Sequence, residues 1–366
     1  MNQESLTTNH ICHLGDSRNM LELSSDSVDL IVTSPPYPMI AMWDDTFATL
    51  APQSAAALAA ERGPAAFEAM HAALDTVWAE CARVLCPGGI ACINIGDAVR
   101  TLGGLFQLYS NHARIIRAFV DLGLHALPAV IWRKQTNAPN KFMGSGMLPP
   151  GAYVTLEHEF VLVFRKGNKR EFKGEDLARR RASAFFWEER NAWFSDVWFD
   201  IKGASQQLAD KAARTRSGAF PFELAWRLIH MFSIQGDTVL DPFLGTGTTL
   251  AAAAAAGRNS AGYEVDPSLA TAVQASALSV MRIGNETIRA RVQAHAAFAE
   301  QRTAQGKEMK HVVAAYGLPC VSRQESGIAL HLVESITCTG PCAYTVEYNP
   351  DPAQALQIPQ SQIELF

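Results

Sequence analysis

The sequence predicts an α/β fold, because short apolar segments alternate with helical segments along most of its 366 residues. Hydrophobic residues make up 48% and charged residues 18% of the chain, a balance that excludes a mostly disordered protein. Most of the predicted strands are nearly continuous apolar runs, which is typical of strands covered on both faces. They are His10–Leu14, Val28–Thr33, Ile90–Ile95, Leu127–Trp132, Glu159–Phe164, Thr238–Asp241 and Ser260–Glu264.

Helical segments lie between these strands and end at residues that stop helices. Ala65–Leu85 is rich in alanine and ends at Cys86-Pro87-Gly88-Gly89. Three further helices are predicted before glycines, at Arg114–Leu122, Phe222–Phe232 and Leu250–Ala256. The last of them is almost pure alanine, which indicates close packing of a helix on the sheet.

Two regions break the alternation. Lys166–Arg216 is rich in arginine, lysine and tryptophan and has no clear period. From about Gly284 the pattern changes again, to an amphipathic helix over Asn285–Ala304, a polar joint and a hairpin over Ile328–Tyr348. We therefore divide the chain into two halves of one α/β domain, residues 1–165 and 217–284, an insert, residues 166–216, and a C-terminal extension, residues 285–366.

The net charge of −5 does not indicate a nucleic-acid-binding protein, but the charge is unevenly distributed along the chain. Arg133 to Arg216 contains 16 Lys and Arg against 10 Asp and Glu, a net charge of +6. A basic middle in an acidic chain is typical of a surface that faces a polyanion. An ordinary solvated face is the alternative on charge alone.

The composition also predicts the compartment and the absence of a metal. No apolar run approaches the roughly 20 residues that cross a bilayer, and the N-terminus lacks the pattern of a signal peptide. The seven cysteines contain no CxxC pair, so neither a zinc site nor a disulfide framework is predicted. We expect a cytoplasmic protein at the nucleoid, without membrane contact and without bound metal.

The first motif that carries chemistry runs from Asp241 to Thr249, where an apolar strand ends in an acid and a Gly-x-Gly turn opens a helix. Such glycines let the backbone approach a ligand at the carboxyl end of a strand. The turn has no lysine for a phosphate-binding loop. Glu264 ends the next strand, where an acid accepts hydrogen bonds from ribose hydroxyls. Together they predict a cofactor that contains adenosine; a purely structural turn is the alternative.

The second motif is Ser34-Pro35-Pro36-Tyr37, directly after an apolar strand. Two prolines remove two backbone donors and stiffen the turn, so a hydroxyl and a carbonyl are held as acceptors. Together they can accept hydrogen bonds from an amino group, while Tyr37 can stack on a planar base. A proline-rich turn with an exposed tyrosine is the alternative.

Thr33–Tyr37 resembles the (D/N/S)PP(Y/F) motif of amino-methyltransferases that use S-adenosylmethionine, and Asp241–Thr249 resembles their cofactor loop. The catalytic motif comes first in the chain, as in the β class of DNA amino-methyltransferases. The resemblance covers roughly residues 10–282. It implies a circularly permuted, Rossmann-like, doubly wound domain with a seven-strand mixed sheet. Three further segments match the family: His13–Asp16, Glu157–Gly167 and Phe220–Leu224.

The resemblance implies roles for particular residues. The catalytic residues are Ser34, Pro35, Pro36 and Tyr37. The residues expected to bind S-adenosyl-L-methionine are Asp16, Phe220, Asp241, Phe243, Gly245, Gly247, Thr248 and Glu264. Those expected to bind double-stranded DNA are Arg133, Lys134, Lys141, Arg179, Arg180 and Arg181.

The implied mechanism is a direct attack by an exocyclic amino nitrogen on the sulfonium methyl group. Ser34 Oγ and the Pro35 carbonyl would accept from the amino group and stabilise the positive charge that grows there. A base inside a duplex cannot reach such a pocket, so it must be flipped out. The insert would contact phosphates and read the sequence.

In this family Ser-Pro-Pro-Tyr usually accompanies methylation of cytosine N4, and Asp-Pro-Pro-Tyr that of adenine N6. Ser34 therefore predicts a site-specific N4-cytosine methyltransferase, with N6-adenine as the alternative. Two more distant alternatives are a catalytically idle DNA-binding regulator and an NAD-dependent dehydrogenase. The intact motifs argue against the first, and Ser-Pro-Pro-Tyr has no role in the second.

The chain ends in Gln362-Ile363-Glu364-Leu365-Phe366. This tail resembles the short Gln-Leu-(Ser/Asp)-Leu-Phe peptide by which bacterial proteins dock on the replication sliding clamp. The two adjacent apolar side chains of Leu365 and Phe366 and the amide of Gln362 suit binding in a preformed pocket. Docking on its own domain or on a second copy of the chain, in a homodimer, is the alternative.

Overall fold

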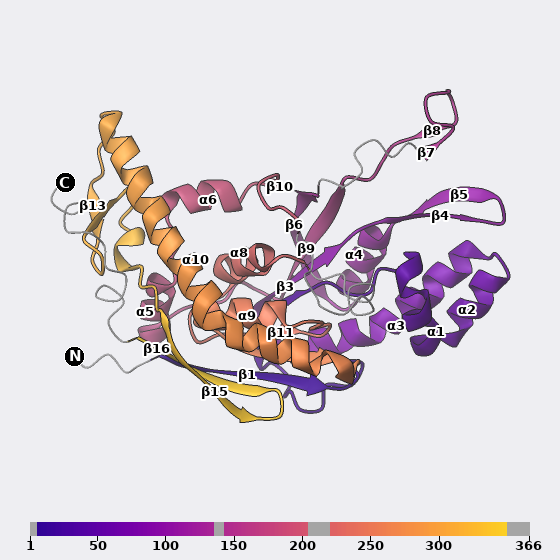
Figure 1. Cartoon of the computed structure of the whole chain (residues 1–366), viewed down its shortest axis with the longest axis horizontal. Helices are drawn as coiled ribbons and strands as arrows, with labels where there is room; N and C mark the ends of the chain where they lie inside the picture. The colour runs from indigo at the N-terminus through magenta and orange to yellow at the C-terminus, as the bar shows by residue number, and fades with distance from the viewer. Residues whose placement is uncertain (1–5, 135–142, 204–219, 350–366) are drawn as a thin grey trace.

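The computed structural model of the protein describes residues 6–134, 143–203 and 220–349 (Figure 1). Its centre is a large mixed sheet. The strands of this sheet are β1 (Thr7–Leu14), β2 (Val28–Thr33), β3 (Leu85–Ile95), β6 (Leu124–Arg133), β9 (His158–Lys166), β10 (Val197–Trp198), β11 (Thr238–Asp241), β12 (Asn259–Glu264), β15 (Val333–Gly340) and β16 (Ala343–Tyr348). They lie in the order β10-β6-β9-β3-β2-β11-β12-β1-β16-β15.

The seven predicted strands form the uninterrupted middle of this sheet, which confirms the α/β class. Strands β1, β12, β11, β2 and β3 are mutually parallel, and β9 runs antiparallel to both β3 and β6. The expected number of seven strands is too low, because the sheet has ten strands in the described part of the chain. The short β10 pairs with β6, and the hairpin β15–β16 pairs with β1, so both edges of the seven-strand core are extended.

Helices cover both faces of the sheet, as a doubly wound fold requires. One face carries α1 (Asp44–Leu50), α3 (Gly63–Val84) and α4 (Asn111–Asp121), and the other α8 (Phe222–Phe232), α9 (Thr248–Ala255) and α10 (Ala270–Ala304). Successive residues of a strand alternate between the two cores: Leu30 and Val32 belong to the α8 and α9 side, and Ile31 to the α3 side. None of the helices in the described residues is long and apolar enough to span a membrane.

The remaining described elements are short. The helices are α2 (Pro52–Ala59), α5 (Gly174–Ala182) and α6 (Trp187–Trp193), with 3-10 turns at Ala41–Trp43, Pro267–Leu269 and Glu325–Gly327. Three separate two-stranded ribbons are β4 (Ala98–Leu102) with β5 (Leu105–Tyr109), β7 (Met143–Gly144) with β8 (Ala152–Tyr153), and β13 (His311–Val313) with β14 (Leu318–Cys320).

The described C-terminal region contributes two strands to the central sheet. The helix predicted over Asn285–Ala304 begins earlier, at Ala270, and runs without a break. Gly284 lies inside it because a Cβ there would lie 2.8 Å from the Cβ of Ala255, so the glycine permits close packing of α10 on α9. The predicted hairpin is confirmed as β15–β16, and its register places Ala343–Glu347 against Thr7–Ile11 of β1 (Figure 1).

Candidate active site

A cavity of about 390 Å³ opens where β1, β2, β11 and β12 end. Its volume is that of a site for a cofactor or drug-sized ligand. It brings together most of the residues that the sequence predicts for catalysis and cofactor binding. They are Asp16, Ser34, Pro35, Pro36, Tyr37, Phe220, Asp241, Phe243, Gly245, Thr248 and Glu264, with Lys134 from the predicted DNA contacts.

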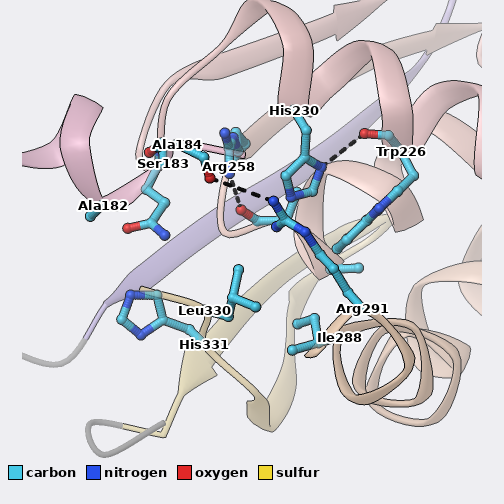
Figure 2. A pocket seen from close by; sticks show the side chains of 13 residues that line it. Ala182, Ser183, Ala184, Trp226, His230, Arg258, Ile288, Arg291, Leu330 and His331 are labelled. Atoms are coloured by element: carbon cyan, nitrogen blue, oxygen red, sulfur yellow. Dashed lines mark hydrogen bonds between the residues drawn. The ribbon is translucent and has the colours of Figure 1, made fainter. Parts of the chain in front are cut away.

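A second cavity, near His230, Arg258 and Arg291, has a volume of only about 10 Å³ (Figure 2). That is room for about one water molecule and excludes a cofactor. Burial, followed by the charges of Arg291 and Arg258, lowers the pKa of His230 well below its usual value. The larger cavity is therefore the candidate active site.

Ser34 and Tyr37 belong to a partly buried hydrogen-bond network in this cavity. Ser34 Oγ donates to Tyr37 Oη at 3.2 Å, and Tyr37 Oη donates to Glu159 Oε2 at 3.0 Å. Asn94 Nδ2 donates to both Tyr37 Oη, at 2.9 Å, and Glu159 Oε2, at 2.8 Å. Burial and the Glu159 carboxylate raise the pKa of Tyr37 well above its usual value, so the phenol keeps its proton. The Tyr37 hydroxyl is therefore bound within the protein, and only its aromatic ring is available to stack on a base.

Asn94 and Glu159 were not predicted as site residues. Asn94 is only 2% exposed and lies in the apolar strand β3. A lone amide in such a strand needs hydrogen-bond partners, and this requirement was the available signal. Glu159 lies at the start of β9, and its second oxygen, Oε1, accepts from Lys134 Nζ at 2.9 Å.

Asp241 connects the turn at Ser34–Tyr37 to the glycine turn at Gly245. Its carboxylate accepts from Thr33 Oγ1 at 2.6 Å, from Thr249 Oγ1 at 2.6 Å and from the Phe243 backbone N–H at 3.0 Å. Thr33 directly precedes Ser34, and Thr249 lies in the first turn of α9. Burial raises the pKa of Asp241 to about 6. Asp241 lines the cavity as predicted, but its carboxylate also accepts these three hydrogen bonds from the protein.

Glu264 holds the glycine turn in a similar way. Its Oε2 accepts from the Gly245 N–H and its Oε1 from the Asp266 N–H, both at 2.8 Å. Burial raises the pKa of Glu264. Gly247, in contrast to the prediction, is not among the residues that line the described cavity; it caps α9 with a φ of 88° and packs on Val273 of α10.

Asp16 follows β1 and lies at the cavity beside Glu264, whose backbone carbonyl accepts from the Gly15 N–H at 2.8 Å. Arg18 binds the Asp16 carboxylate at 2.6 Å, and this hydrogen bond lowers the pKa of Asp16. The same guanidinium donates to the carbonyl of Leu50 at the end of α1, at 3.2 Å. Asp16 is thus held in the charged state that can accept hydrogen bonds from a ligand.

Apolar side chains complete the wall, and most of them were not predicted. They come from the segment between β2 and α1, from α3, and from the segments that end or follow β11 and β12. They are Ile40, Met42, Trp43, Leu74, Val77, Phe243, Tyr263 and Leu269. Carboxylates at one side and a wide apolar and aromatic wall suit a ligand with a ribose and a purine.

The predicted DNA contacts fall into two places. Arg133 and Lys134 lie at the end of β6 beside the cavity, where Arg133 pairs with Glu157 at 3.1 Å. Lys141 lies outside the described residues, as do Gln362–Phe366. Of the tryptophans of the insert, Trp193 and Trp198 are buried in the core, whereas Trp187 is 38% exposed.

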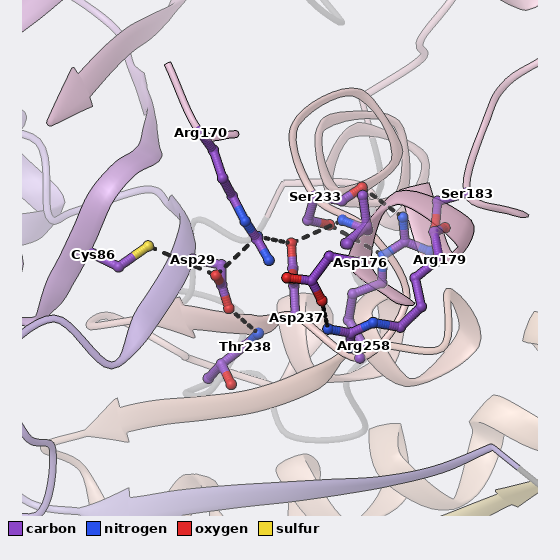
Figure 3. Close-up of polar contacts among 12 residues, drawn as sticks. Asp29, Cys86, Arg170, Asp176, Arg179, Ser183, Ser233, Asp237, Thr238 and Arg258 are labelled. Carbon is purple, nitrogen blue, oxygen red and sulfur yellow. Dashed lines mark hydrogen bonds and ion pairs between the residues drawn. The ribbon is translucent and has the colours of Figure 1, made fainter. Parts of the chain in front are cut away.

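Arg179, Arg180 and Arg181 lie on α5. Figure 3 shows Arg179 of this helix near Asp237 and Thr238, at the end of the strands opposite the cavity. Arg179 binds Asp176 and donates to the carbonyl of Gln235, just before β11 begins. Arg180 lies 4.7 Å from the ring centroid of Phe172. The structure does not bring these arginines to the cavity, so their role in DNA binding stays a prediction.

Nearby, Arg170 fixes the insert to the starts of β2 and β11, since it binds Asp29 at 3.0 Å and Asp237 at 2.8 Å (Figure 3). Asp29 also accepts from the Thr238 N–H at 2.9 Å. This end of the insert is therefore committed to contacts within the protein.

From the sequence alone, neutralising Arg179, Arg180 and Arg181 together is predicted to flatten the salt dependence of DNA affinity, and the position of these side chains in the structure changes that expectation. DNA affinity falls with salt in proportion to the number of phosphates contacted. Because these side chains lie away from the cavity, we expect the triple glutamine variant to keep the wild-type slope of log affinity against log salt. The slope is measured by fluorescence anisotropy with a labelled duplex. A shallower slope would show that DNA reaches α5.

Comparison with known proteins identifies the family. The family model described as DNA methylase matches residues 28–275, which is more than half of the chain. The chain belongs to this family of DNA methylases. The matched part of the DNA methylase begins at β2, before the catalytic turn, and ends inside α10. It therefore contains Ser34, Asn94 and the glycine turn at Gly245.

Three relatives illustrate how similar this DNA methylase is to known proteins. Type II methyltransferase M.MthZI of Methanothermobacter thermautotrophicus is 49% identical over 328 residues, 89% of this chain and 91% of the relative. Type II methyltransferase M.MjaI of Methanocaldococcus jannaschii is 50% identical over 275 residues, 72% of this chain and 89% of the relative. The structure of TTHA0409 from Thermus thermophilus, complexed with S-adenosyl-L-methionine, is 34% identical. The match covers 74% of this chain and 94% of that one, with a TM-score of 0.57.

Proposed function

We propose that this DNA methylase is a site-specific N4-cytosine methyltransferase of DNA. It is a DNA methyltransferase of the N4/N6 amino-methylating family, and its cofactor is S-adenosyl-L-methionine. The observation that carries the finer proposal is Ser34 in the catalytic turn, with its oxygen at the cavity and its proton directed to Tyr37. N6-adenine is the alternative.

The residues of the cavity fit the cofactor. The carboxylates of Asp16 and Glu264 lie at the end where ribose hydroxyls and an adenine amino group need acceptors, and Phe243 supplies an aromatic wall. When bound, S-adenosyl-L-methionine supplies an electrophilic methyl group on a sulfonium. Glu264 holds the turn at Gly245 by accepting from its N–H, and because glycine has no side chain, the ligand can approach the backbone of this turn.

The catalytic turn provides the acceptors for the amino group of the base. Ser34 Oγ and the Pro35 carbonyl accept its two N–H bonds, which orients the nitrogen and stabilises the positive charge that develops on it. The ring of Tyr37 stacks on the flipped base, since its hydroxyl is already bound within the protein. Flipping costs a few kcal/mol, which contacts to the DNA backbone offset.

Arg133 and Lys134 are proposed to contact phosphates next to the flipped base. Arg133 ends β6 and Lys134 follows it, at the cavity side of the sheet. Arg133 is about half exposed and pairs with Glu157 at the surface, where an ion pair is worth little and can be exchanged for a phosphate.

The identity of the methylated base in the product tests the proposed function. Duplex DNA incubated with the protein and labelled S-adenosyl-L-methionine is expected to become labelled and, after digestion, to contain N4-methylcytosine. Mass spectrometry of the nucleosides distinguishes it from N6-methyladenine. N6-methyladenine alone would establish the alternative, and DNA without label would contradict both.

A further inference from the structure

The proton of Tyr37 determines how the hydroxyl of Ser34 is oriented. A carboxylate only accepts hydrogen bonds, so the contact of 3.0 Å between Tyr37 and Glu159 must use the phenolic proton. Tyr37 Oη then has only acceptor capacity for its other neighbours, which are Ser34, Asn94 and the backbone of Gly96. Ser34 therefore donates its own proton to Tyr37, and of its two lone pairs one faces Asn94 Nδ2 at 3.5 Å and the other is left for a ligand in the cavity.

Asn94 reinforces this polarity. Its Nδ2 lies 2.8 Å from Glu159 Oε2 and 2.9 Å from Tyr37 Oη, so the amide nitrogen, not the amide oxygen, faces these acceptors. Asn94 thus adds another donor to Tyr37 Oη, while the single phenolic proton is accepted by Glu159 and is not available for Ser34.

Lys134 holds the second oxygen of Glu159 in place. Its Nζ lies 2.9 Å from Glu159 Oε1, and the Glu159 side chain is only 13% exposed, whereas that of Lys134 is 46% exposed. Gly96 allows the close approach of Tyr37 and Glu159, because a Cβ at this position would lie 3.0 Å from the Tyr37 ring and 3.4 Å from Glu159 Cγ.

We propose that Glu159 is a positioning residue that acts through Tyr37 to make Ser34 Oγ an obligate acceptor, and so selects bases that present an amino group. An oxygen on a base at the same place would meet a lone pair and no proton, which is repulsive. This inference rests on the proposed function, since it assigns the substrate group that the same site takes.

The test compares two replacements of Glu159. Gln keeps the shape but can present an N–H to Tyr37, which frees the tyrosine to donate to Ser34 and turns the serine proton toward the cavity. Asp is shorter but remains an acceptor only. We expect Glu159→Gln to lower kcat about ten- to a hundredfold, with KM for DNA and the cofactor Kd within about twofold of wild type. Glu159→Asp is expected to retain more activity than Glu159→Gln.

A double variant tests the route through Tyr37. If Glu159 acts through the phenol, then Glu159→Gln causes no further loss in a Tyr37→Phe background, since both changes release the same serine proton. If the two fold-losses multiply, or if Glu159→Asp is slower than Glu159→Gln, the proposal is overturned. Thermal unfolding of each variant identifies a loss that comes from misfolding.

Glu286→Gln is the matched control. Glu286 lies on α10, pairs with Arg282 at 3.4 Å and is well exposed, so wild-type kcat is expected. If the wild-type protein transfers no methyl group to DNA, the proposed function fails. If it is active and Glu159→Gln has the wild-type kcat, only the inference about Glu159 fails.

Discussion

Replacing Ser34 with alanine is expected to lower kcat about 10²–10³-fold, or roughly 2.7–4 kcal/mol, by analogy with the loss of one preorganised oxyanion-hole group. Ser34 lines the cavity, and in the proposed mechanism its oxygen is the side-chain acceptor for the amino group. The cofactor Kd is expected to stay nearly unchanged, because the contacts that hold Asp241 and Glu264 do not involve Ser34. Single-turnover methylation with saturating cofactor measures the rate, and calorimetry measures the affinity.

Ser335→Ala is the control for this variant. Ser335 lies on β15 at the far edge of the sheet, where its hydroxyl donates to Glu347 at 2.9 Å. It removes one hydroxyl from the surface and is expected to leave the rate unchanged. A Ser34→Ala protein that methylates DNA at the wild-type rate would remove Ser34 from the reaction.

Replacing Asp241 with alanine is expected to weaken cofactor binding about ten- to a hundredfold, since each donor left unpaired in a buried site costs about 1–3 kcal/mol. The reason differs from the one the sequence suggested. Thr33 and Thr249 lose their common acceptor, so the catalytic turn and the start of α9 are no longer held together. Calorimetric titration with S-adenosyl-L-methionine measures the change. Asp121→Ala, which removes an exposed carboxylate on α4 that pairs with Arg117, is expected to bind as wild type does.

The pH dependence of stability gives a second measurement on Asp241. Its pKa is about 6 in the folded chain against 3.8 without burial, so the folded state binds the proton more tightly. Its contribution to the free energy of unfolding is therefore largest below about pH 4 and falls by about 3 kcal/mol as the pH rises to about 6. Asp241→Asn is expected to remove this fall. Denaturant unfolding of both proteins between pH 4 and 7 checks it, and parallel curves would contradict the raised pKa.

The seven central strands were predictable because most of them are local, nearly continuous apolar runs, as burial on two faces requires. The pairing of β10 and of the hairpin β15–β16 with the sheet was not predictable, because it depends on contacts between segments that are distant in the sequence. β16 pairs with β1 although more than 300 residues separate them in the sequence, and neither segment has a pattern that identifies its partner. The helices α1 and α2 were missed because Asp44–Ala59 is mostly alanine and polar residues without a strong period.

The site was predicted as far as its motifs are local. Ser34 and Glu264 were identified from their positions at the ends of strands, and the structure places both at the cavity. Glu159 and Asn94 lie on two strands that pair in the sheet, and their meeting depends on the antiparallel register of β3 and β9. The roles of Asp241 and Tyr37 within the protein could not be read from sequence, since both depend on which donors the fold brings to them.

The place of β1 in the sheet has a consequence for the order in which the chain folds. β1 leaves the ribosome before the other described strands, yet its two neighbours are β12 and β16, so His10 lies opposite Ser260 on one side and Tyr344 on the other. Contacts of such sequence separation form slowly, because a long loop must close before they are made. The nascent chain therefore carries an unpaired strand with two open edges through most of its synthesis. Until the last strands are made, the sheet itself cannot protect this strand from pairing with other chains.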